Sequence, residues 1–250
     1  MKISFVIPAH NEERYIGRCL ESVVLEAGEY PGEIEILVVD NASTDKTAEV
    51  ARSFPGVKVV YEPHKGITWA RMAGFVKSSG EIIANIDSDT MLTPGWLKQV
   101  LREFDNDPDL LAVSGPFIYH DLPRRVMLWV NLFYYLAYAT YLVNRFIFGT
   151  SSMLQGGNFA VKRKALQEIG GFNTEISFYG EDTDLAKRLH KIGKVKFTFS
   201  LPIYTSGRRL AKEGILTSAI KYGVNYFWII MTGKPYTKDY VDIRHDLDKS

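Results

Sequence analysis

The chain has 250 residues, with 30 lysines and arginines against 29 aspartates and glutamates, and a single cysteine. Its formal net charge of +1 provides no overall positive field, so we expect no nucleic-acid partner. One cysteine excludes an internal disulfide framework, and Cys19 falls in the apolar register of a predicted helix, as a small buried side chain does. The apolar run 3–7 stops at Pro8 and is too short for a secretory signal. We therefore expect one cytoplasmic domain.

Apolar runs alternate with helical patterns along the chain, which indicates an α/β fold with a parallel sheet. Strands are predicted at 3–7, 34–39, 57–61, 82–86 and 110–115, and later at 157–161 and 195–199. Helices are predicted after Asn11 as far as Gly28, from about 43–45 to before Pro55, at 68–79 and at 182–192. The pattern changes only at 126–148, which is rich in aromatic and aliphatic residues.

Two carboxylates, Asp87 and Asp89, directly follow the predicted buried strand 82–86. Open α/β sheets bind their ligands at the carboxyl ends of their strands. Mg²⁺ and Mn²⁺ prefer hard oxygen ligands, and one or two protein carboxylates suffice when a diphosphate completes the coordination shell. Because surface turns often contain an Asp-x-Asp pair, its interpretation depends on the loops around it.

The loops 8–12, 40–45 and 87–89 follow the first, second and fourth strands and would meet at one edge of a parallel sheet. A nucleotide is the natural occupant of such an edge. Asp40 suits a hydrogen bond to a base or ribose, and it equally suits a turn that caps the following helix. Glu12 is placed either at this site, which we favour, or in a helix start together with its neighbour.

Seven motifs occur in order along the chain. They are Val6 to Glu12, Val38 to Asp45, His64 to Arg71, Asp87-Ser88-Asp89, Gly156 to Ala160, Gly171-Phe172 and Gly180 to Asp184. Together they resemble the family 2 glycosyltransferases over roughly residues 3–210. The resemblance implies the GT-A fold, a Rossmann-like, mostly parallel sheet flanked by helices, together with inversion of the anomeric centre, a nucleotide-diphosphate sugar and a divalent metal.

The resemblance also implies a domain organisation. Residues 1–210 would form the GT-A domain, in which 1–115 bind the nucleotide sugar and 116–210, with the aromatic helical insertion 126–148, bind the acceptor. Residues 211–250 would add a C-terminal helix and a charged tail packed on the same domain.

Roles are implied position by position. The nucleotide-sugar site would contain Pro8, Ala9, Glu12, Asp40, Arg71, Asp87, Ser88 and Asp89, and Asp89 with Asp87 would hold Mn²⁺ or Mg²⁺. Gly157, Asn158, Glu181, Arg208 and Arg209 are expected at the acceptor or the diphosphate. Asp182 would be the general base, although helix capping explains it better from the residues alone. The alternatives are an exposed helix arginine for Arg71 and an exposed basic loop for 208–209.

The chain departs from the family pattern in two places. Some members carry a metal-binding histidine near Arg208, and processive members carry a Gln-x-x-Arg-Trp motif. Neither occurs here. The first absence puts the third metal ligand in doubt, and the second argues against polymer synthesis.

The segment from Val126 to Val143 has only Asn131 and Thr140 as clearly polar residues besides its tyrosines. Its length approaches that of a membrane span, but tyrosine is typical of membrane interfaces. We favour a peripheral membrane or lipid-acceptor surface over a buried or dimer-forming helix, and both over a transmembrane helix. The arginines at 124, 125 and 145 would meet lipid phosphates, the aromatic run 222–231 would pack against this segment, and a polyprenyl-lipid acceptor follows as a hypothesis.

The sequence therefore predicts a metal-dependent, inverting, non-processive glycosyltransferase, cytoplasmic or peripheral on the inner face of the cell membrane. It would move a sugar from a UDP- or GDP-linked donor to a sugar acceptor's hydroxyl or to a lipid phosphate, and a homodimer stays open. One alternative is a sugar nucleotidyltransferase, which more often has a glycine-rich, basic loop near the first strand; 8–12 has none. The other is a non-catalytic sugar-binding or membrane-scaffold protein, against which the intact Asp87, Asp89 and Asp182 argue.

Overall fold

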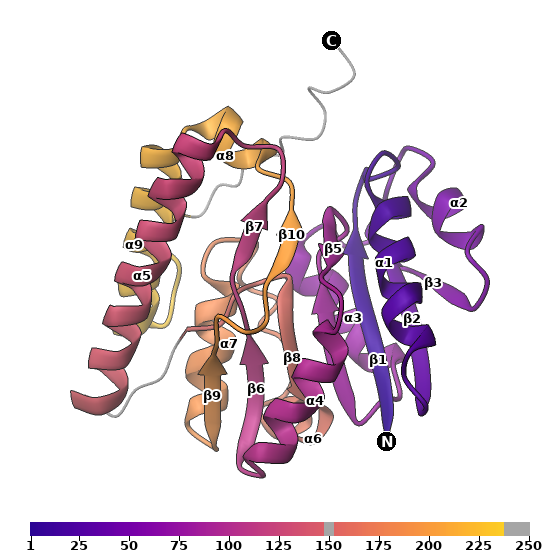
Figure 1. The fold of residues 1–250 in the computed structure, drawn as a ribbon, viewed down its shortest axis with the longest axis horizontal. Helices are drawn as coiled ribbons and strands as arrows, with labels where there is room; N and C mark the ends of the chain where they lie inside the picture. The colour runs from indigo at the N-terminus through magenta and orange to yellow at the C-terminus, as the bar shows by residue number, and fades with distance from the viewer. Residues whose placement is uncertain (148–152, 238–250) are drawn as a thin grey trace.

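The computed structural model describes residues 1–147 and 153–237, and side chains in these ranges except at 144–147. Strands and helices alternate through most of the chain (Figure 1). In order they are β1 Lys2–Ala9, α1 Ile16–Gly28, β2 Glu33–Asp40, α2 Thr47–Arg52, β3 Val57–Tyr61, α3 Ile67–Lys77, β4 Ile82–Ile86, β5 Thr90–Leu92, α4 Trp96–Asn106, β6 Leu110–Ser114, β7 Phe117–Tyr119, α5 Arg124–Ile147, β8 Asn158–Lys162, α6 Arg163–Glu168, α7 Glu181–His190, β9 Lys194–Phe197, β10 Ile203–Thr205, α8 Arg208–Glu213 and α9 Ile215–Thr232.

The central sheet has seven strands in the order β3-β2-β1-β4-β8-β6-β9. All its pairings are parallel except those of β8, which runs antiparallel to both β4 and β6. The predicted mostly parallel α/β class is confirmed, and every predicted strand is present with its ends within two residues. The sequence predicts these strands because both faces of the sheet are covered, so each inner strand is a continuous apolar run.

A second sheet of three short strands, in the order β5-β10-β7, was not predicted. Strands of three residues are too short to show an alternating pattern, so only their pairing defines them. In β10, Thr205 pairs with Thr90 of β5, directly after the Asp-x-Asp segment. This small sheet therefore holds the start of α8 beside Asp89.

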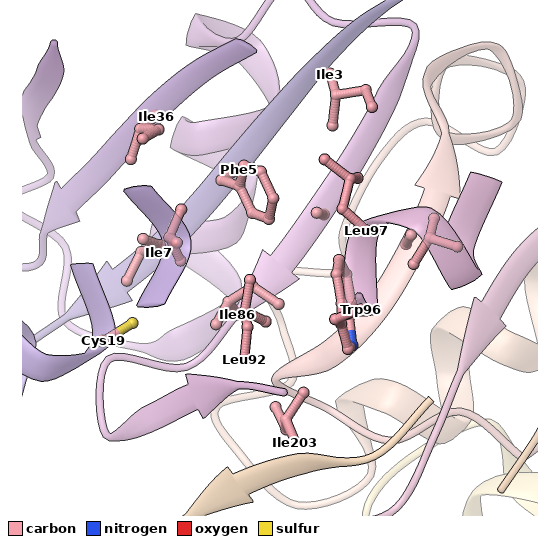
Figure 2. Packing of buried hydrophobic residues seen from close by; sticks show 14 of the residues in the cluster. Ile3, Phe5, Ile7, Cys19, Ile36, Ile86, Leu92, Trp96, Leu97 and Ile203 are labelled. Atoms are coloured by element: carbon pink, nitrogen blue, oxygen red, sulfur yellow. The ribbon is translucent and has the colours of Figure 1, made fainter. Parts of the chain in front are cut away.

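The core has two layers, one on each face of the central sheet. Ile3, Phe5 and Ile7 of β1 pack with α1 and α4 on one face (Figure 2), while Val6 points to the opposite face, toward α3, α6 and α7. Alternate residues of a strand point to opposite faces, which explains this division. Cys19 is fully buried in the first layer, as predicted, and burial raises the pKa of its thiol.

Two predicted helices begin later in the structure than the sequence indicates. The first starts at Ile16 rather than after Asn11, which has a left-handed φ of 52°. The second starts at Thr47, whose backbone N–H donates to Asp45 Oδ1 (2.9 Å). The residues ahead of both helices form interlocked loops instead, because Glu12 N–H donates to Thr47 Oγ1 (2.7 Å).

Both aromatic runs form helices, α5 and α9, which lie at the same flank of the molecule (Figure 1). Within α5, the window 124–143 has a mean hydropathy of 1.4 and is 17% buried, so by length and composition it is able to span a membrane. Val130 and Tyr134 anchor α5 on Phe197 of β9. The side chain of Arg145, residue 148 of the aromatic segment and residues 238–250 of the charged tail lie outside the described residues.

Candidate active site

A cavity of about 900 Å³ opens at the carboxyl ends of β1 and β4 and continues between α5 and α9. Most of the predicted site residues line it: Pro8, Ala9, Glu12, Arg71, Asp87, Ser88, Asp89, Glu181, Asp182, Arg208 and Arg209. They come from loops that are far apart in the sequence, and the parallel pairing of β1 with β2 and β4 brings the first of these loops together. The predicted meeting of the strand ends is confirmed.

The Asp-x-Asp segment forms a tight turn after β4. Thr90 N–H and Oγ1–H both donate to the carbonyl of Asp87 (3.1 and 2.7 Å), and Asp87 N–H donates to the carbonyl of Gly157 (3.2 Å). Gly157 has φ +79°, and an added Cβ would lie 2.1 Å from Asp87 Oδ2. Glycine is therefore required at this position, because it leaves room for the Asp87 carboxylate.

Arg71 of α3 is 1% exposed and forms ion pairs with Glu181 and with Asp87, the latter at 3.1 Å. Its guanidinium also lies over the ring of Phe159, 5.6 Å from the centroid. Burial alone would lower the pKa of Arg71, but the carboxylates of Glu181 and Asp87 raise it. The alternative of an exposed helix arginine is wrong. Arg71 is a fixed cation that joins the Asp-x-Asp turn to the start of α7.

Glu181 and Asp182 are held at the amino terminus of α7. Asp182 Oδ2 accepts from Gly156 N–H (3.3 Å) and Oδ1 from Thr183 N–H (2.7 Å), while Gly180, not Asp182, occupies the N-cap position. Burial raises the pKa of Asp182, and these backbone donors work against the increase. Burial also raises the pKa of Glu181 to about 7, although Arg71 opposes it. Asp182 thus has the raised basicity that a proton acceptor requires.

The adjacent arginines at the start of α8 face different parts of the cavity. Arg208 bonds to Glu12, pairs with Asp89 (2.9 Å between Nη2 and Oδ2) and lies over a tyrosine ring. Arg209 pairs with Glu213 (2.9 Å) and stacks over Phe178. Their side chains are 13% and 16% exposed, so the alternative of an exposed basic loop is wrong.

Asp40 and Asn158 do not line the cavity within the described part of the chain. Asp40 Oδ1 accepts from Ser43 N–H (3.1 Å), which is the turn contact given above as its alternative role. The Asn158 side chain is fully buried, donates to the carbonyls of Pro116 and Leu201, and accepts from Trp96 Nε1–H (3.0 Å). The predicted acceptor role for Asn158 is therefore corrected, since its amide joins the sheet to two loops.

Asn41 was not singled out from the sequence as a functional residue, yet it lines the cavity and joins two of its loops. Its amide donates to the carbonyls of Glu62 (3.1 Å) and His64 (2.7 Å), and its Oδ1 accepts from Gly66 N–H (2.8 Å). These bonds join the loop after β2 to the loop that precedes α3. The only sequence signal is an asparagine after a strand, which is also an ordinary turn residue.

The acidic residues fit one kind of metal site. Among the described residues, no cluster of three or more His, Cys, Asp or Glu side chains is arranged to hold a metal ion. Asp87 and Asp89 are 33% and 19% exposed toward the cavity, and each is paired with an arginine. Two carboxylates suit a Mg²⁺ or Mn²⁺ ion that takes its other ligands from a bound diphosphate and water. They do not form a site made of protein ligands alone.

Comparisons with known proteins identify the family of this chain. The model of glycosyl transferase family 2 matches residues 4–170, and that of the N-terminal domain of galactosyltransferase matches residues 147–206. A glucosyl-dolichyl phosphate glucuronosyltransferase of Haloferax volcanii is 25% identical over 72% of this chain and 59% of its own. The probable glycosyltransferase YdaM of Bacillus subtilis is 28% identical over 77% of this chain and 47% of its own. The chain thus spans about half of these relatives' lengths.

Two solved structures share the fold. A mannosyltransferase of Pyrobaculum calidifontis, in complex with GDP-Man and Mn²⁺, has a TM-score of 0.70 at 21% identity, over 93% of this chain and 65% of its own. Glucosyl-3-phosphoglycerate synthase of Mycobacterium tuberculosis, with Mn²⁺, UDP and phosphoglyceric acid, has a TM-score of 0.62 at 21% identity, over 94% of this chain and 80% of its own. The chain belongs to glycosyl transferase family 2 and has the GT-A fold.

Proposed function

We propose that this protein transfers a sugar, with inversion and without processivity, from a UDP- or GDP-linked donor to a sugar acceptor's hydroxyl or to a lipid phosphate. The observation that carries the proposal is that one cavity contains both a pair of carboxylates at the end of β4 and the half-buried carboxylate of Asp182. Support also comes from the mannosyltransferase, which was solved with GDP-Man and Mn²⁺, and from the synthase, which was solved with UDP and Mn²⁺.

The first part of the cavity suits the donor. Pro8 and Ala9 at the end of β1 and Ser88 in the Asp-x-Asp turn would contact the nucleotide. A divalent ion, held by Asp89 and Asp87, would supply positive charge that stabilises the departing diphosphate. Arg208, which pairs with Asp89, has a guanidinium suited to phosphate oxygens. The proposed division of the domain places this donor site in residues 1–115 and the acceptor in 116–210.

Asp182 is the proposed general base. It would take the proton from an acceptor hydroxyl while the acceptor oxygen attacks the sugar carbon opposite the diphosphate. The N–H groups of Gly156 and Thr183 hold the two oxygens of its carboxylate. Glu181, bonded to the fixed charge of Arg71, would position the acceptor.

Calorimetric binding of UDP and GDP, with and without Mn²⁺, tests the donor site in the wild type and in Asp89→Ala. We expect Mn²⁺-dependent binding of one diphosphate, which Asp89→Ala abolishes. Asp105→Ala is the matched control, because Asp105 is an exposed residue of α4 and does not line the cavity. Asp182→Asn should keep diphosphate binding and lose sugar transfer. Mn²⁺-dependent binding that survives unchanged in Asp89→Ala would contradict the metal assignment, and binding of neither diphosphate would contradict the donor site.

A further inference from the structure

The part of the cavity beyond Asp182 is long, apolar and bounded by two helices. It is lined at helical spacing by Trp129, Phe133 and Leu136 of α5 and by Ser218, Tyr222 and Tyr226 of α9. Residues three or four apart share one face of a helix, so each helix presents a whole face to this space. The same cavity reaches Asp182 without interruption. A ligand that fills it would therefore have a reactive polar end and a long apolar part.

The outer surfaces of the two helices are also apolar. Leu128 and Tyr135 of α5 are 70% and 64% exposed, while Leu216 and Met231 of α9 are 74% and 80% exposed. Large side chains of this kind, gathered on adjacent helices, exceed the scattered apolar residues of an ordinary soluble surface. The apolar cavity thus lies beside an apolar outer surface, formed by the same two helices.

Charge indicates what covers this surface. Neither α5 nor α9 contains an aspartate or a glutamate. Exposed basic side chains lie at the ends of the helices: Arg124 and Arg125 begin α5, Lys212 precedes α9, and Lys234 follows it. Apolar side chains with exposed arginine and lysine side chains at the ends of their helices complement a bilayer with anionic headgroups. A second copy of the same surface would instead bring like charges together.

We propose that α5 and α9 lie on an anionic membrane surface and that the acceptor is a phosphorylated lipid. Its hydrocarbon chain would occupy the apolar part of the cavity between the helices, and its head would reach Asp182. This inference rests on the proposed function and names its acceptor. Arg209, which also lines the cavity, has a guanidinium suited to the lipid phosphate.

The transfer step balances for such an acceptor. An ionised phosphate oxygen of the lipid attacks the sugar carbon and forms the new C–O bond. The bond from that carbon to the nucleoside diphosphate breaks, and its electron pair leaves with the diphosphate. The lipid phosphate attacks as its monoanion, and its remaining proton passes to Asp182 as the new C–O bond forms.

Vesicle binding tests the surface. We expect the wild-type protein to sediment with phosphatidylcholine vesicles that contain phosphatidylglycerol. The double variant Leu128→Ser with Trp228→Ser should bind these vesicles more weakly by about tenfold or more, since each change removes an exposed apolar anchor. Leu25→Ser is the matched control, because Leu25 is 73% exposed on α1, away from these helices. Equal vesicle binding by the wild type, the double variant and Leu25→Ser would contradict the proposal that α5 and α9 bind the membrane.

Tryptophan fluorescence locates the contact on the chain. Trp129 and Trp228 lie on α5 and α9, whereas Trp96 is buried in the core and Trp69, 37% exposed, lies on α3. Brominated phosphatidylcholine in the vesicles should quench the wild-type fluorescence, and Trp129→Phe with Trp228→Phe should remove most of the quenching. Retention of the full quenching would place the membrane elsewhere. If only detergent extracts the protein from the vesicles, α5 spans the membrane, and the proposal that it lies on the membrane surface is wrong.

The cavity itself is tested with farnesyl phosphate and inorganic phosphate as probes. We expect saturable binding of farnesyl phosphate, and binding of inorganic phosphate weaker by about a hundredfold or more, because inorganic phosphate has no chain to bury. Ala219→Trp, which fills the space beside α9, should abolish farnesyl phosphate binding and leave Mn²⁺-dependent diphosphate binding intact. Equal binding of the two probes, or unchanged farnesyl phosphate binding by Ala219→Trp, would contradict the proposal that the cavity binds the hydrocarbon chain of a lipid.

Two outcomes separate this inference from the proposed function. If the wild type binds a diphosphate with Mn²⁺ but neither vesicles nor farnesyl phosphate, the inference fails alone. If no diphosphate binds, the proposed function fails, and the lipid loses its role as acceptor. Dimers that form without lipid and dissociate in the Leu128→Ser, Trp228→Ser variant would show that a second copy covers the surface, which also overturns the inference.

Discussion

Removing the charge of Arg71 should destabilise the protein through Glu181. In Arg71→Met, the buried carboxylate of Glu181, 9% exposed, loses its cationic partner, whereas Asp87, 33% exposed, can be rehydrated. Breaking a buried ion pair from one side costs about 3–5 kcal/mol. Because only Glu181 is left as a buried charge without its cationic partner, we expect a loss of about 3 kcal/mol in the free energy of unfolding at pH 8. At that pH the wild-type Glu181, with a pKa raised by burial to about 7, is mostly ionised.

A double-mutant cycle with Glu181→Gln separates the energy of the Arg71–Glu181 ion pair from the energy that packing of the Arg71 side chain contributes. Once Glu181 is neutral, removing Arg71 leaves no buried charge at that position, so the double variant should be less destabilised than the sum of the single changes. We expect a coupling energy of about 2 kcal/mol, measured by urea denaturation at pH 8 without metal. At pH 6, below the raised pKa of Glu181, the carboxyl is mostly protonated in the folded protein, so the coupling should decrease.

Additive losses in this cycle at pH 8 would refute the reasoning, because the destabilisation would then come from lost packing of the Arg71 side chain. A loss below about 1 kcal/mol in Arg71→Met would refute it as well, since that is the range of exposed ion pairs. Arg71→Lys, which keeps the charge but not the two-branched donor, should fall between the wild type and Arg71→Met.

Two further changes act at other positions. Gly157→Ala should abolish Mn²⁺-dependent diphosphate binding in calorimetry, because the new Cβ would collide with Asp87, and should cost about 1–2 kcal/mol of stability at a φ of +79°. Glu35→Gln should reduce stability at pH 7 by about 2 kcal/mol in urea denaturation. Burial would raise the pKa of Glu35, but hydrogen bonds from Ser4 and Ser79 and Lys58 lower it from 4.5 to about 2, so its carboxylate stabilises the fold above pH 4.5 and this contribution is lost as the pH falls toward 2.

These expectations have their own controls. Gly56→Ala also replaces a glycine of positive φ, +80°, but its Cβ would meet no neighbouring atom, so it should keep diphosphate binding. Equal binding by Gly157→Ala and Gly56→Ala would show that Asp87 has room to move. For Glu35→Gln, the stability difference from the wild type should shrink as the pH falls from 5 to 2. A difference that stays constant over that range would mean that the charge of Glu35 contributes nothing.

The local part of this structure follows from the sequence. Strands β1 and β4 were readable because their residues are buried on both faces and form continuous apolar runs. The position of the Asp-x-Asp turn also follows from the sequence, because polar residues that end a buried apolar run must lie at the edge of the sheet. The burial of Cys19 followed from its register in an amphipathic helix. These features depend on neighbours within a few residues along the chain.

The tertiary structure decided the partners of the charged and polar residues. Arg71 and Glu181 are 110 positions apart, and Arg208 and Glu12 are 196 apart, so no local pattern indicates that they pair. Asn158 lies within a recognisable motif, yet β8 runs antiparallel to β4, and the Asn158 side-chain amide donates hydrogen bonds to backbone carbonyls of the protein. Periodicity reports which residues are buried. It does not report which buried polar groups meet, because that depends on how distant segments pack. Here this packing places the Asp-x-Asp turn, Asp182 and the two apolar helices around one cavity.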